Sequence, residues 1–204
     1  MNIVIIDGYT LNPGDLNLSK LMQLGNVKVY DRSSKDQIID RLKDADIAIV
    51  NKVVFNETII DRLPRLKYIA LTATGYNNLD IKYLHKKNIL ASNVSNYGSH
   101  AVAQHAFALI LELTNHVAQH YQDCKDEKWN QTPDFCFWSQ NMTELYQKKI
   151  GIIGLGNIGF RTAMIAQAFG MEVYYHSRTD KNINGFHFVS DPKDIFSQCD
   201  IVSL

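Results

Sequence analysis

Three glycines at a fixed spacing constrain the fold of this chain more than any other feature of its sequence. They stand in the run GLGNIG at residues 154–159, between the apolar segment Lys149–Ile153 and a segment with helical periodicity that ends at Phe169. Gly170 is predicted to end that helix, and Glu172–Tyr175 is predicted to be the next strand. The pattern therefore predicts a strand, a glycine loop, a helix and a second strand.

Each glycine of this run has a physical task when a dinucleotide binds. Gly154 allows the tight turn, Gly156 lets a pyrophosphate approach the backbone, and Gly159 lets the helix pack closely on the strand. Asn157 and Ile158 lie between them at the start of the helix, where free N–H groups and the positive end of the helix dipole attract phosphates. An ordinary turn is the alternative, but the full match in this context favours a nicotinamide dinucleotide.

The end of the second strand indicates which dinucleotide is bound. An Asp or Glu there binds the ribose hydroxyls of NAD, whereas a nearby arginine accommodates the extra phosphate of NADP. The sequence reads YHSRT at residues 175–179, so no acid stands at the strand end. Ser177 and Arg178 are suited to hold a 2′-phosphate, with His176 in support, and we predict NADP(H) or use of both cofactors. Alternatively, Arg178 is a solvated surface residue and NAD binds through other contacts.

The remaining sequence alternates between apolar runs and segments with helical periodicity. Continuous apolar runs are typical of strands that are covered on both faces of a parallel sheet. The predicted strands are residues 3–6, 27–30, 47–50, 68–71, 89–92 and 200–204, and the predicted helices include residues 35–43, 56–62 and 194–197. The fold class is therefore α/β. We predict a flavodoxin-like domain at residues 1–98 and an incomplete Rossmann-type nucleotide-binding domain at residues 99–204.

A long amphipathic helix is predicted from Ser99 to about Tyr121, with Ser99 as its N-cap. Its apolar side chains are predicted to fall largely on one side: Val102, Phe107, Leu109, Ile110 and Leu113. Residues 126–143 break the periodicity and are rich in aromatic side chains, which indicates an ordered loop.

Composition and charge argue against several classes of protein. The 21 Lys and Arg residues balance the 21 Asp and Glu residues, so neither nucleic acid nor an anionic membrane is an expected partner. Cys124, Cys136 and Cys199 form no close pair, which predicts a reducing cytoplasm and no zinc or other metal site. The apolar run at the N-terminus is too short for a signal peptide or a membrane span.

Several segments together resemble the D-isomer-specific 2-hydroxyacid dehydrogenases, and within them the glycerate dehydrogenase (hydroxypyruvate reductase) branch. These segments are DGYTLNPGD at 7–15, NK at 51–52, ATGYN at 73–77, NVSNYGSHAVAQ at 93–104, PDFCFW at 133–138 and GLGNIG at 154–159. The resemblance covers essentially all 204 residues in the expected order. PDFCFW and DGYTLNPGD are its most branch-specific parts.

The resemblance implies a substrate domain and a nucleotide domain, with the active site in the cleft between them. Hydride would pass between the nicotinamide and C2 of a small 2-oxo acid such as hydroxypyruvate or glyoxylate. The backbone N–H groups of Thr74 and Gly75 would hold the substrate carboxylate, and Lys52 would line the same pocket. Val102 would contact the nicotinamide. Without the resemblance, Lys52 reads equally well as a solvated lysine and Val102 as a core residue.

The resemblance further implies a homodimer, in which Trp138 or Phe137 reaches the active site of the partner; local packing is the alternative for both. The catalytic Arg, Glu and His of the family are expected beyond Leu204, so none of that set is expected within this chain. Two functions therefore stay open. The chain is part of an oxidoreductase for small 2-hydroxy acids, or it is a dinucleotide-binding protein without turnover.

Overall fold

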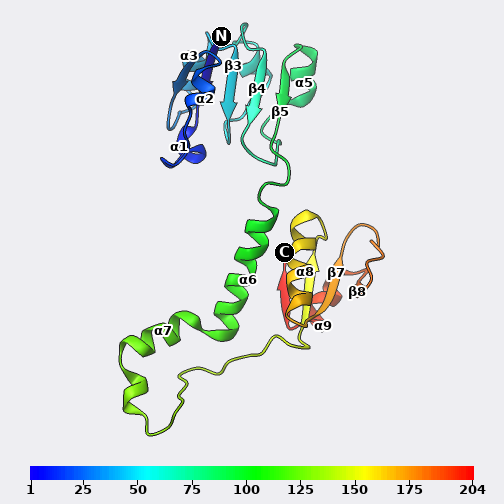
Figure 1. Cartoon of the computed structure of the whole chain (residues 1–204). Helices are drawn as coiled ribbons and strands as arrows, with labels where there is room; N and C mark the ends of the chain where they lie inside the picture. Colours follow the sequence, from blue (N-terminus) through cyan, green and yellow to red (C-terminus); the bar gives the residue numbers. More distant parts are fainter. The chain divides into compact units, whose positions relative to one another are not determined.

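The continuous apolar runs form the central strands of two separate parallel sheets. The computed structural model describes residues 1–204, which divide into two units, Met1–Tyr97 and Gly98–Leu204, each with its own sheet and core (Figure 1). The sheet of the first unit has the order β2-β1-β3-β4-β5, and that of the second has the order β8-β7-β6-β9. All pairs of neighbouring strands are parallel.

The first unit has the strand order of flavodoxin-like folds. Its strands are β1 (Asn2–Ile5), β2 (Asn26–Val29), β3 (Ile47–Val50), β4 (Tyr68–Leu71) and β5 (Leu90–Ser92), and its helices are α1 (Gly8–Leu11), α2 (Ser19–Met22), α3 (Gln37–Leu42), α4 (Glu57–Ile60) and α5 (Ile81–Lys86). Val4 and Ile6 pack into the core on one face of the sheet, and Ile3 and Ile5 pack on the other. The apolar run at residues 3–6 is continuous because both faces of β1 are covered.

The second unit has a sheet order that corresponds to the first four strands of the doubly wound dinucleotide-binding arrangement. Its elements are α6 (Ser99–Asn115), α7 (Val117–Lys125), the 3₁₀ helix η1 (Lys128–Gln131), β6 (Lys149–Ile153), α8 (Asn157–Ala168), β7 (Glu172–His176), β8 (Phe186–Phe188), α9 (Pro192–Gln198) and β9 (Ile201–Ser203). The core forms where α6 and α8 pack against each other and the sheet, around Phe107, Ile150 and Val173. The prediction of a strand, a glycine loop, a helix and a second strand is confirmed. Strand β8 was not predicted.

Gly170 ends α8 as predicted. Its φ of +72° lies in the left-handed region that favours glycine. The Gly170 N–H donates to the Gln167 carbonyl (2.9 Å), and the Met171 N–H donates to the Ala166 carbonyl (3.1 Å). These two hydrogen bonds satisfy carbonyls in the last turn and direct the chain into β7.

The prediction of one long helix after Ser99 is wrong, because the chain breaks at His116. His116 takes a left-handed conformation (φ 50°, ψ 46°) and separates α6 from α7. The Glu112 carboxylate accepts a hydrogen bond from the Ala118 N–H (3.1 Å), which stabilises the start of α7. The expected cap is also displaced by one residue, since Gly98 is the N-cap and Ser99 is the first helical residue.

The predicted apolar face of α6 is only partly correct. Phe107 and Ile110 are buried as expected, together with Ala103, at the spacing of one helical stripe. The other three predicted members, Val102, Leu109 and Leu113, are exposed. At about 100° of rotation per residue they form a second stripe, about 100° around the helix from the first.

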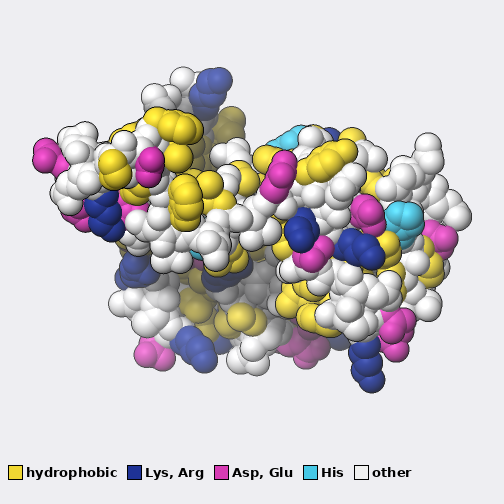
Figure 2. All heavy atoms as spheres, turned by 90° about the horizontal axis from the view of Figure 1, so that it is seen from below, with side chains coloured by type: hydrophobic (Ala, Val, Ile, Leu, Met, Phe, Trp, Pro, Cys, Tyr) yellow, Lys and Arg dark blue, Asp and Glu magenta, His cyan; other side chains and the backbone are white.

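Two general observations concern the surface. No helix of the chain is both long enough and apolar enough to cross a membrane. On the face that Figure 2 shows, cationic and anionic side chains are interspersed, and neither sign gathers into a large patch.

The segment after α7 is an ordered loop, as predicted. Asp123 of α7 holds this loop to the helix through hydrogen bonds. The Asp123 side chain is fully buried and accepts hydrogen bonds from Lys128 Nζ (2.7 Å) and Gln119 Nε2 (2.8 Å). The edge of the Trp129 ring also meets the Phe137 ring, with 5.7 Å between the ring centroids. The hydrogen bond from Lys128 is the largest cause that lowers the pKa of Asp123 from 3.8 to about 2.

Acid is expected to release this loop. A carboxylate whose pKa is lower in the folded chain stabilises the fold above its unfolded pKa, and that contribution is lost as the pH falls from about 4 to about 2. Both tryptophans of the chain, Trp129 and Trp138, lie in the loop, so their fluorescence reports its state. We expect an acid transition in this pH window that Asp123→Asn removes and Asp126→Asn retains. Identical transitions in both variants would show that Asp123 does not hold the loop.

Candidate functional site

The glycine loop connects the carboxyl end of β6 to the start of α8 and lies beside the carboxyl end of β7. Gly154 directly follows β6 with a φ of +103°, a conformation that a residue with a side chain rarely adopts. Its N–H donates to the carbonyl of His176, the last residue of β7 (2.9 Å). The loop therefore begins as a tight turn that is fixed to the neighbouring strand.

The other two glycines leave room for different neighbours. A Cβ atom on Gly159 would lie 2.2 Å from the Gly154 carbonyl oxygen and 3.1 Å from Cγ2 of Ile152. This contact requires glycine wherever α8 packs so closely on the loop and β6. A Cβ atom on Gly156 would instead meet nothing within 4 Å. Gly156 thus borders an open space that a ligand atom can occupy. A side chain at position 156 would fill that space and exclude the ligand.

The first turn of α8 offers hydrogen-bond donors to that space. Gly156 is the N-cap, and the first hydrogen bond of the helix runs from the Phe160 N–H to the Gly156 carbonyl (2.8 Å). The N–H groups of Ile158 and Gly159 precede it and have no acceptor within the helix. Donors at a helix N-terminus, beside an open glycine cradle, fit the pyrophosphate of a dinucleotide.

The segment after β7 carries one exposed cation close to the strand end. Arg178 is exposed and forms no ion pair. The Ser177 hydroxyl donates to the Thr179 carbonyl (2.6 Å), so it shapes the turn that presents Arg178. The His176 ring is hydrogen-bonded through Nδ1 to the Val189 carbonyl (3.0 Å), a contact made within the sheet rather than towards a ligand.

Sequence patterns did not reveal two residues that hold this segment in place. Tyr175 of β7 is completely buried, and its hydroxyl donates a hydrogen bond to the Asp180 carboxylate. The Lys181 N–H donates to the same hydroxyl (3.0 Å). An aromatic residue in a strand reads as core and an acid five residues later reads as loop surface, so only the folded chain shows that they meet.

In the first unit, Thr74 and Gly75 follow β4 at the carboxyl edge of the sheet. The Thr74 hydroxyl donates to the Val94 carbonyl (3.0 Å), and Asn93 Nδ2 donates to the Thr74 carbonyl (2.8 Å). These contacts fix the loop through other atoms. Both residues are exposed, and their backbone N–H groups make no hydrogen bond within the chain. The loop is therefore built with two free donors, as the binding of a carboxylate requires.

Lys52 follows β3, the strand next to β4, and its loop is fixed from two sides. The Asp7 carboxylate accepts hydrogen bonds from the N–H groups of Asn51 (2.8 Å) and Lys52 (2.6 Å). From the other side, Asn78 Nδ2 donates to the Val53 carbonyl (2.8 Å). The Lys52 ammonium is exposed and has no acidic partner, so it is available to an anion. No sequence pattern links Asp7 with Lys52, because that link depends on β1 and β3 being neighbours in the sheet.

A cavity of about 570 Å³ adjoins Lys52 at this edge of the first sheet. Its lining includes the apolar side chains of Val53, Val54 and Ile59, the cations Arg32, Lys35 and Lys52, and the acids Asp7 and Asp31. The guanidinium of Arg32 lies over the Tyr9 ring, 4.0 Å from its centroid. A lining that mixes apolar side chains with charges of both signs suits a small organic molecule better than a bare ion.

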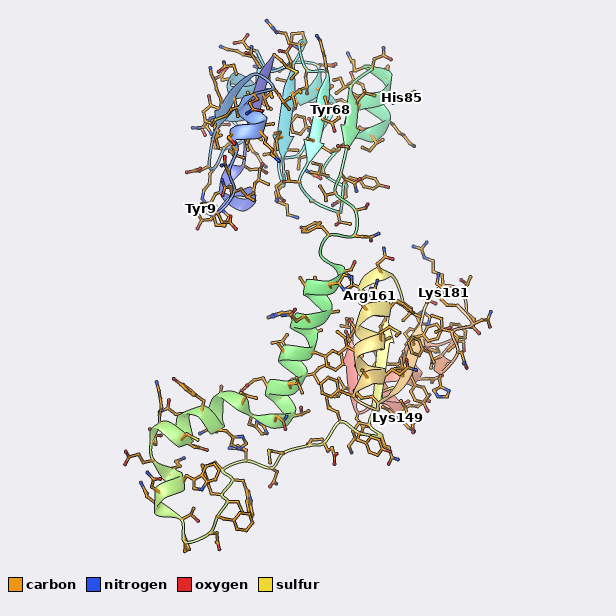
Figure 3. All side chains as sticks on the ribbon, viewed as in Figure 1. Tyr9, Tyr68, His85, Lys149, Arg161 and Lys181 are labelled. Atoms are coloured by element: carbon orange, nitrogen blue, oxygen red, sulfur yellow. The ribbon has the colours of Figure 1, made fainter.

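The predicted site residues thus fall into two groups. Lys52, Thr74 and Gly75 lie at the carboxyl edge of the first sheet, where β3 and β4 end. The residues of the glycine loop, Ser177 and Arg178 lie at the carboxyl edge of the second sheet, where β6 and β7 end. Val102 lies in the first turn of α6 and is exposed, so the alternative interpretation of Val102 as a core residue is wrong. Figure 3 shows Arg161 and Lys181 towards the loop end of the second unit and Lys149 at its opposite end.

Comparison with known proteins places these features in a family. The family model for the catalytic domain of D-isomer specific 2-hydroxyacid dehydrogenases matches residues 3–176. A hydroxypyruvate reductase of Blautia hydrogenotrophica is 40% identical over 211 residues, which cover 100% of this chain and 65% of that protein. A glycerate dehydrogenase of Methylorubrum extorquens is 28% identical over 178 residues, which cover 87% of this chain and 55% of that protein.

Solved structures show the same relationship. An acyclic imino acid reductase in complex with NADPH and D-Arg superposes with a TM-score of 0.80 at 30% identity, and the match covers 100% of this chain and 64% of that one. A D-lactate dehydrogenase from Aquifex aeolicus, complexed with NAD and lactic acid, gives a TM-score of 0.78 at 27% identity, with 100% and 60% covered. The chain spans 65% or less of the length of the relatives named here.

Proposed function

The chain belongs to the D-isomer-specific 2-hydroxyacid dehydrogenase family, as its motifs predict, and we propose that it binds a nicotinamide dinucleotide for the reduction of a small 2-oxo acid to a D-2-hydroxy acid. Hydroxypyruvate is the first substrate to test and glyoxylate the second, because the chain is similar to a protein named hydroxypyruvate reductase. In this proposal residues 1–98 form the substrate domain and residues 99–204 belong to the nucleotide domain.

The observation that carries the proposal is the open cradle at Gly156. The loop combines a tight turn at Gly154, close packing at Gly159, and the N–H groups of Ile158 and Gly159, which have no acceptor within α8. Each of these is what a bound pyrophosphate needs, and together they leave space where it would lie. We assign Gly154, Gly156, Asn157, Ile158 and Gly159 to the pyrophosphate.

The first unit offers groups that suit the carboxylate of a 2-oxo acid. The N–H groups of Thr74 and Gly75 would donate to its oxygens, and the Lys52 ammonium would neutralise its charge. Asp7 would keep Lys52 in place without competing for the ligand, because backbone N–H groups already occupy its carboxylate. When bound, the nicotinamide would supply the hydride for C2, and Val102 would contact that part of the cofactor.

We propose a preference for NADP(H) over NAD(H). Its support is the free Arg178 cation just after β7, with Ser177 shaping the turn and no acid at the strand end. The two related structures described above contain NADPH in one case and NAD in the other, so family membership alone does not select either cofactor.

Arg178→Ala is expected to weaken NADPH binding about tenfold or more, since a cation that contacts a phosphate contributes about 1.4 kcal/mol or more when the charge is paired. NADH binding should change less than about twofold because NADH lacks the 2′-phosphate. Titration calorimetry with both cofactors measures the two dissociation constants. Arg62→Ala, which removes the same charge from an exposed position in the first unit, is the matched control. Equal losses for both cofactors would contradict the assignment.

A homodimer is the proposed assembly. The loop after α7 exposes large apolar side chains, among them Phe135 and Trp138, which are 90% and 67% exposed. Phe137 packs on Trp129 within the loop, so Trp138 is the better candidate to reach a partner. Exposed aromatic side chains of this size are typical of interfaces. A monodisperse monomer in light scattering at micromolar concentration would contradict the dimer.

A cytoplasmic location is proposed from the cysteines. Cys124, Cys136 and Cys199 are all free thiols in the folded chain. Free thiols persist in a reducing compartment, whereas secreted proteins of this size commonly pair them. Fractionation of the source cells with an antibody to the chain tests this proposal.

Cofactor binding and turnover test different parts of the proposed function. The chain should bind NADPH or NADH by calorimetry. Adding hydroxypyruvate or glyoxylate then tests turnover, which is measured as oxidation of the bound cofactor. Absence of binding to either cofactor would overturn the proposal as a whole. Binding without turnover would favour the dinucleotide-binding protein over the enzyme for the chain as given.

A further inference from the structure

The segment after β7 contains an exposed acid, Asp180, one oxygen of which is hydrogen-bonded to the protein. Asp180 lies four residues after the end of β7, near the place where an acid would select NAD. Its Oδ1 accepts two hydrogen bonds, one from the Tyr175 hydroxyl and one from the Asn182 N–H (2.8 Å). The carboxylate is therefore engaged with the protein on the oxygen that both donors share.

Tyr175 is well placed to hold that carboxylate. Its ring is fully buried in β7, packed against Phe188 with 5.6 Å between centroids, while its hydroxyl reaches the loop. The hydroxyl accepts from the Lys181 N–H (3.0 Å) and donates to Asp180, so both of its hydrogen-bonding functions are used. Burial raises the pKa of Tyr175, and the hydrogen bond from Tyr175 lowers the pKa of Asp180. Near neutral pH the phenol is thus the donor and the carboxylate the charged acceptor.

Unlike the Asp180 carboxylate, the cationic side chains of the same loop have no hydrogen-bonded or ionic partner. Arg178 and Lys181 are exposed, and neither side chain is paired with Asp180 or any other acid. Figure 3 shows the Lys181 side chain on this loop, at the end of the unit that also carries Arg161. The cations of the folded loop are therefore unpaired, whereas its carboxylate is held towards β7 through Oδ1.

We propose that the hydrogen bond between Tyr175 and Asp180 is a latch that sets cofactor choice by withholding a carboxylate from the 2′-position of the bound dinucleotide. This inference rests on the proposed function, because it assumes that the segment after β7 receives the adenosine ribose. With the latch closed, Arg178 meets the 2′-phosphate without competition from Asp180. With the latch open, the freed carboxylate repels a phosphate and accepts hydrogen bonds from the two ribose hydroxyls of NADH.

The latch is tested by two substitutions and their combination. Tyr175→Phe removes only the hydroxyl and leaves the buried ring in place. We expect it to weaken NADPH binding about five- to tenfold, because the freed Asp180 carboxylate repels the 2′-phosphate, and to leave NADH binding unchanged or tighter. Asp180→Asn keeps an acceptor oxygen for Tyr175 but removes the charge, so both affinities should stay within about twofold of the unsubstituted chain.

The double variant Tyr175→Phe/Asp180→Asn separates a charge effect from simple loosening of the loop. Once the charge is gone, an open latch no longer repels the phosphate, and NADPH affinity should return to within about twofold of the unsubstituted chain. Tyr174→Phe is the matched control, because the neighbouring hydroxyl contacts only Glu172 on the exposed surface (3.4 Å). It should change neither affinity, and circular dichroism should show all four variants folded.

The outcomes separate the latch from the function on which it rests. A chain that binds neither cofactor overturns the proposed function, and one that binds NADH at least as tightly as NADPH overturns the cofactor preference together with the latch. If the unsubstituted chain prefers NADPH, the latch is overturned by equal losses of both cofactors in Tyr175→Phe. A double variant that binds NADPH as weakly as Tyr175→Phe overturns it too, since released charge is then not the cause.

Discussion

Gly156→Ala is expected to weaken dinucleotide binding strongly while the second unit stays folded. The added methyl group would enter space that holds no protein atom within 4 Å, so it meets no clash in the free chain. The backbone of Gly156 (φ −82°, ψ −162°) is also open to any residue. The same methyl group would occupy the place where the pyrophosphate approaches the loop. Affinity for NADPH should fall about tenfold or more, which corresponds to about 1.4 kcal/mol or more.

Gly159→Ala is the contrasting variant, three residues away. Its Cβ atom would lie 2.2 Å from a backbone oxygen, which cannot move without shifting the loop or α8. Overpacking of this kind costs about 1–3 kcal/mol and should lower the melting temperature by roughly 5–20 °C. Gly156→Ala should stay within about 4 °C of the unsubstituted chain. Equal thermal losses in the two variants, or full binding by Gly156→Ala, would show that Gly156 does not face the pyrophosphate.

The sequence was sufficient for those parts of the fold that depend on continuous apolar runs and glycine spacing. The runs at residues 47–50 and 68–71 coincide with β3 and β4. Strands that are covered on both faces of a parallel sheet appear in the sequence as continuous apolar runs, which are easy to recognise. Gly170 similarly marks the end of α8, because its left-handed conformation favours glycine. These features depend only on residues that are close together in the sequence, so the sequence is sufficient to predict them.

The break between α6 and α7 shows where local signals fail. His116 adopts a left-handed conformation without a glycine or proline nearby, and its neighbours continue a helical pattern. What favours the break is the contact of Glu112 with the Ala118 N–H and of the His116 ring with the Asn141 carbonyl. The second of these joins residues 25 positions apart. Strand β8 was missed for a related reason, as three residues in a polar segment give too short a run to identify.

The candidate site divides in the same way. The glycines, Lys52 and Arg178 were selected from the residue types that phosphates and carboxylates require. Asp7 enters the sequence analysis only within the segment DGYTLNPGD, and Tyr175 only as the last residue of a predicted strand. Their partners are fixed by the order of strands in each sheet and by the path of the loop after β7. Residues that bind a ligand are thus easier to find from sequence than residues that hold the binding groups in place.

Asp7→Ala is expected to destabilise the first unit and release the loop that carries Lys52. It would leave the N–H groups of Asn51, Lys52 and Val53 without their acceptor, and a hydrogen bond to a charged group contributes about 1.5–3 kcal/mol. Water reaches the exposed Lys52 N–H, so we expect a net cost of about 1–3 kcal/mol and a fall in melting temperature of roughly 5–20 °C. Thermal unfolding followed by circular dichroism measures the loss.

Hydrogen exchange separates release of this loop from a general loss of stability. The amide protons of Asn51, Lys52 and Val53 should exchange faster in Asp7→Ala than the loss of global stability requires, whereas those of β4 should follow the global change. Asp15→Ala is the matched control, because Asp15 is exposed and makes no hydrogen bond or ion pair. Its melting temperature and exchange rates should match those of the unsubstituted chain. Unchanged exchange at residues 51–53 in Asp7→Ala would mean that Asn78 alone fixes the Lys52 loop, through its hydrogen bonds to the carbonyls of Asn51 and Val53.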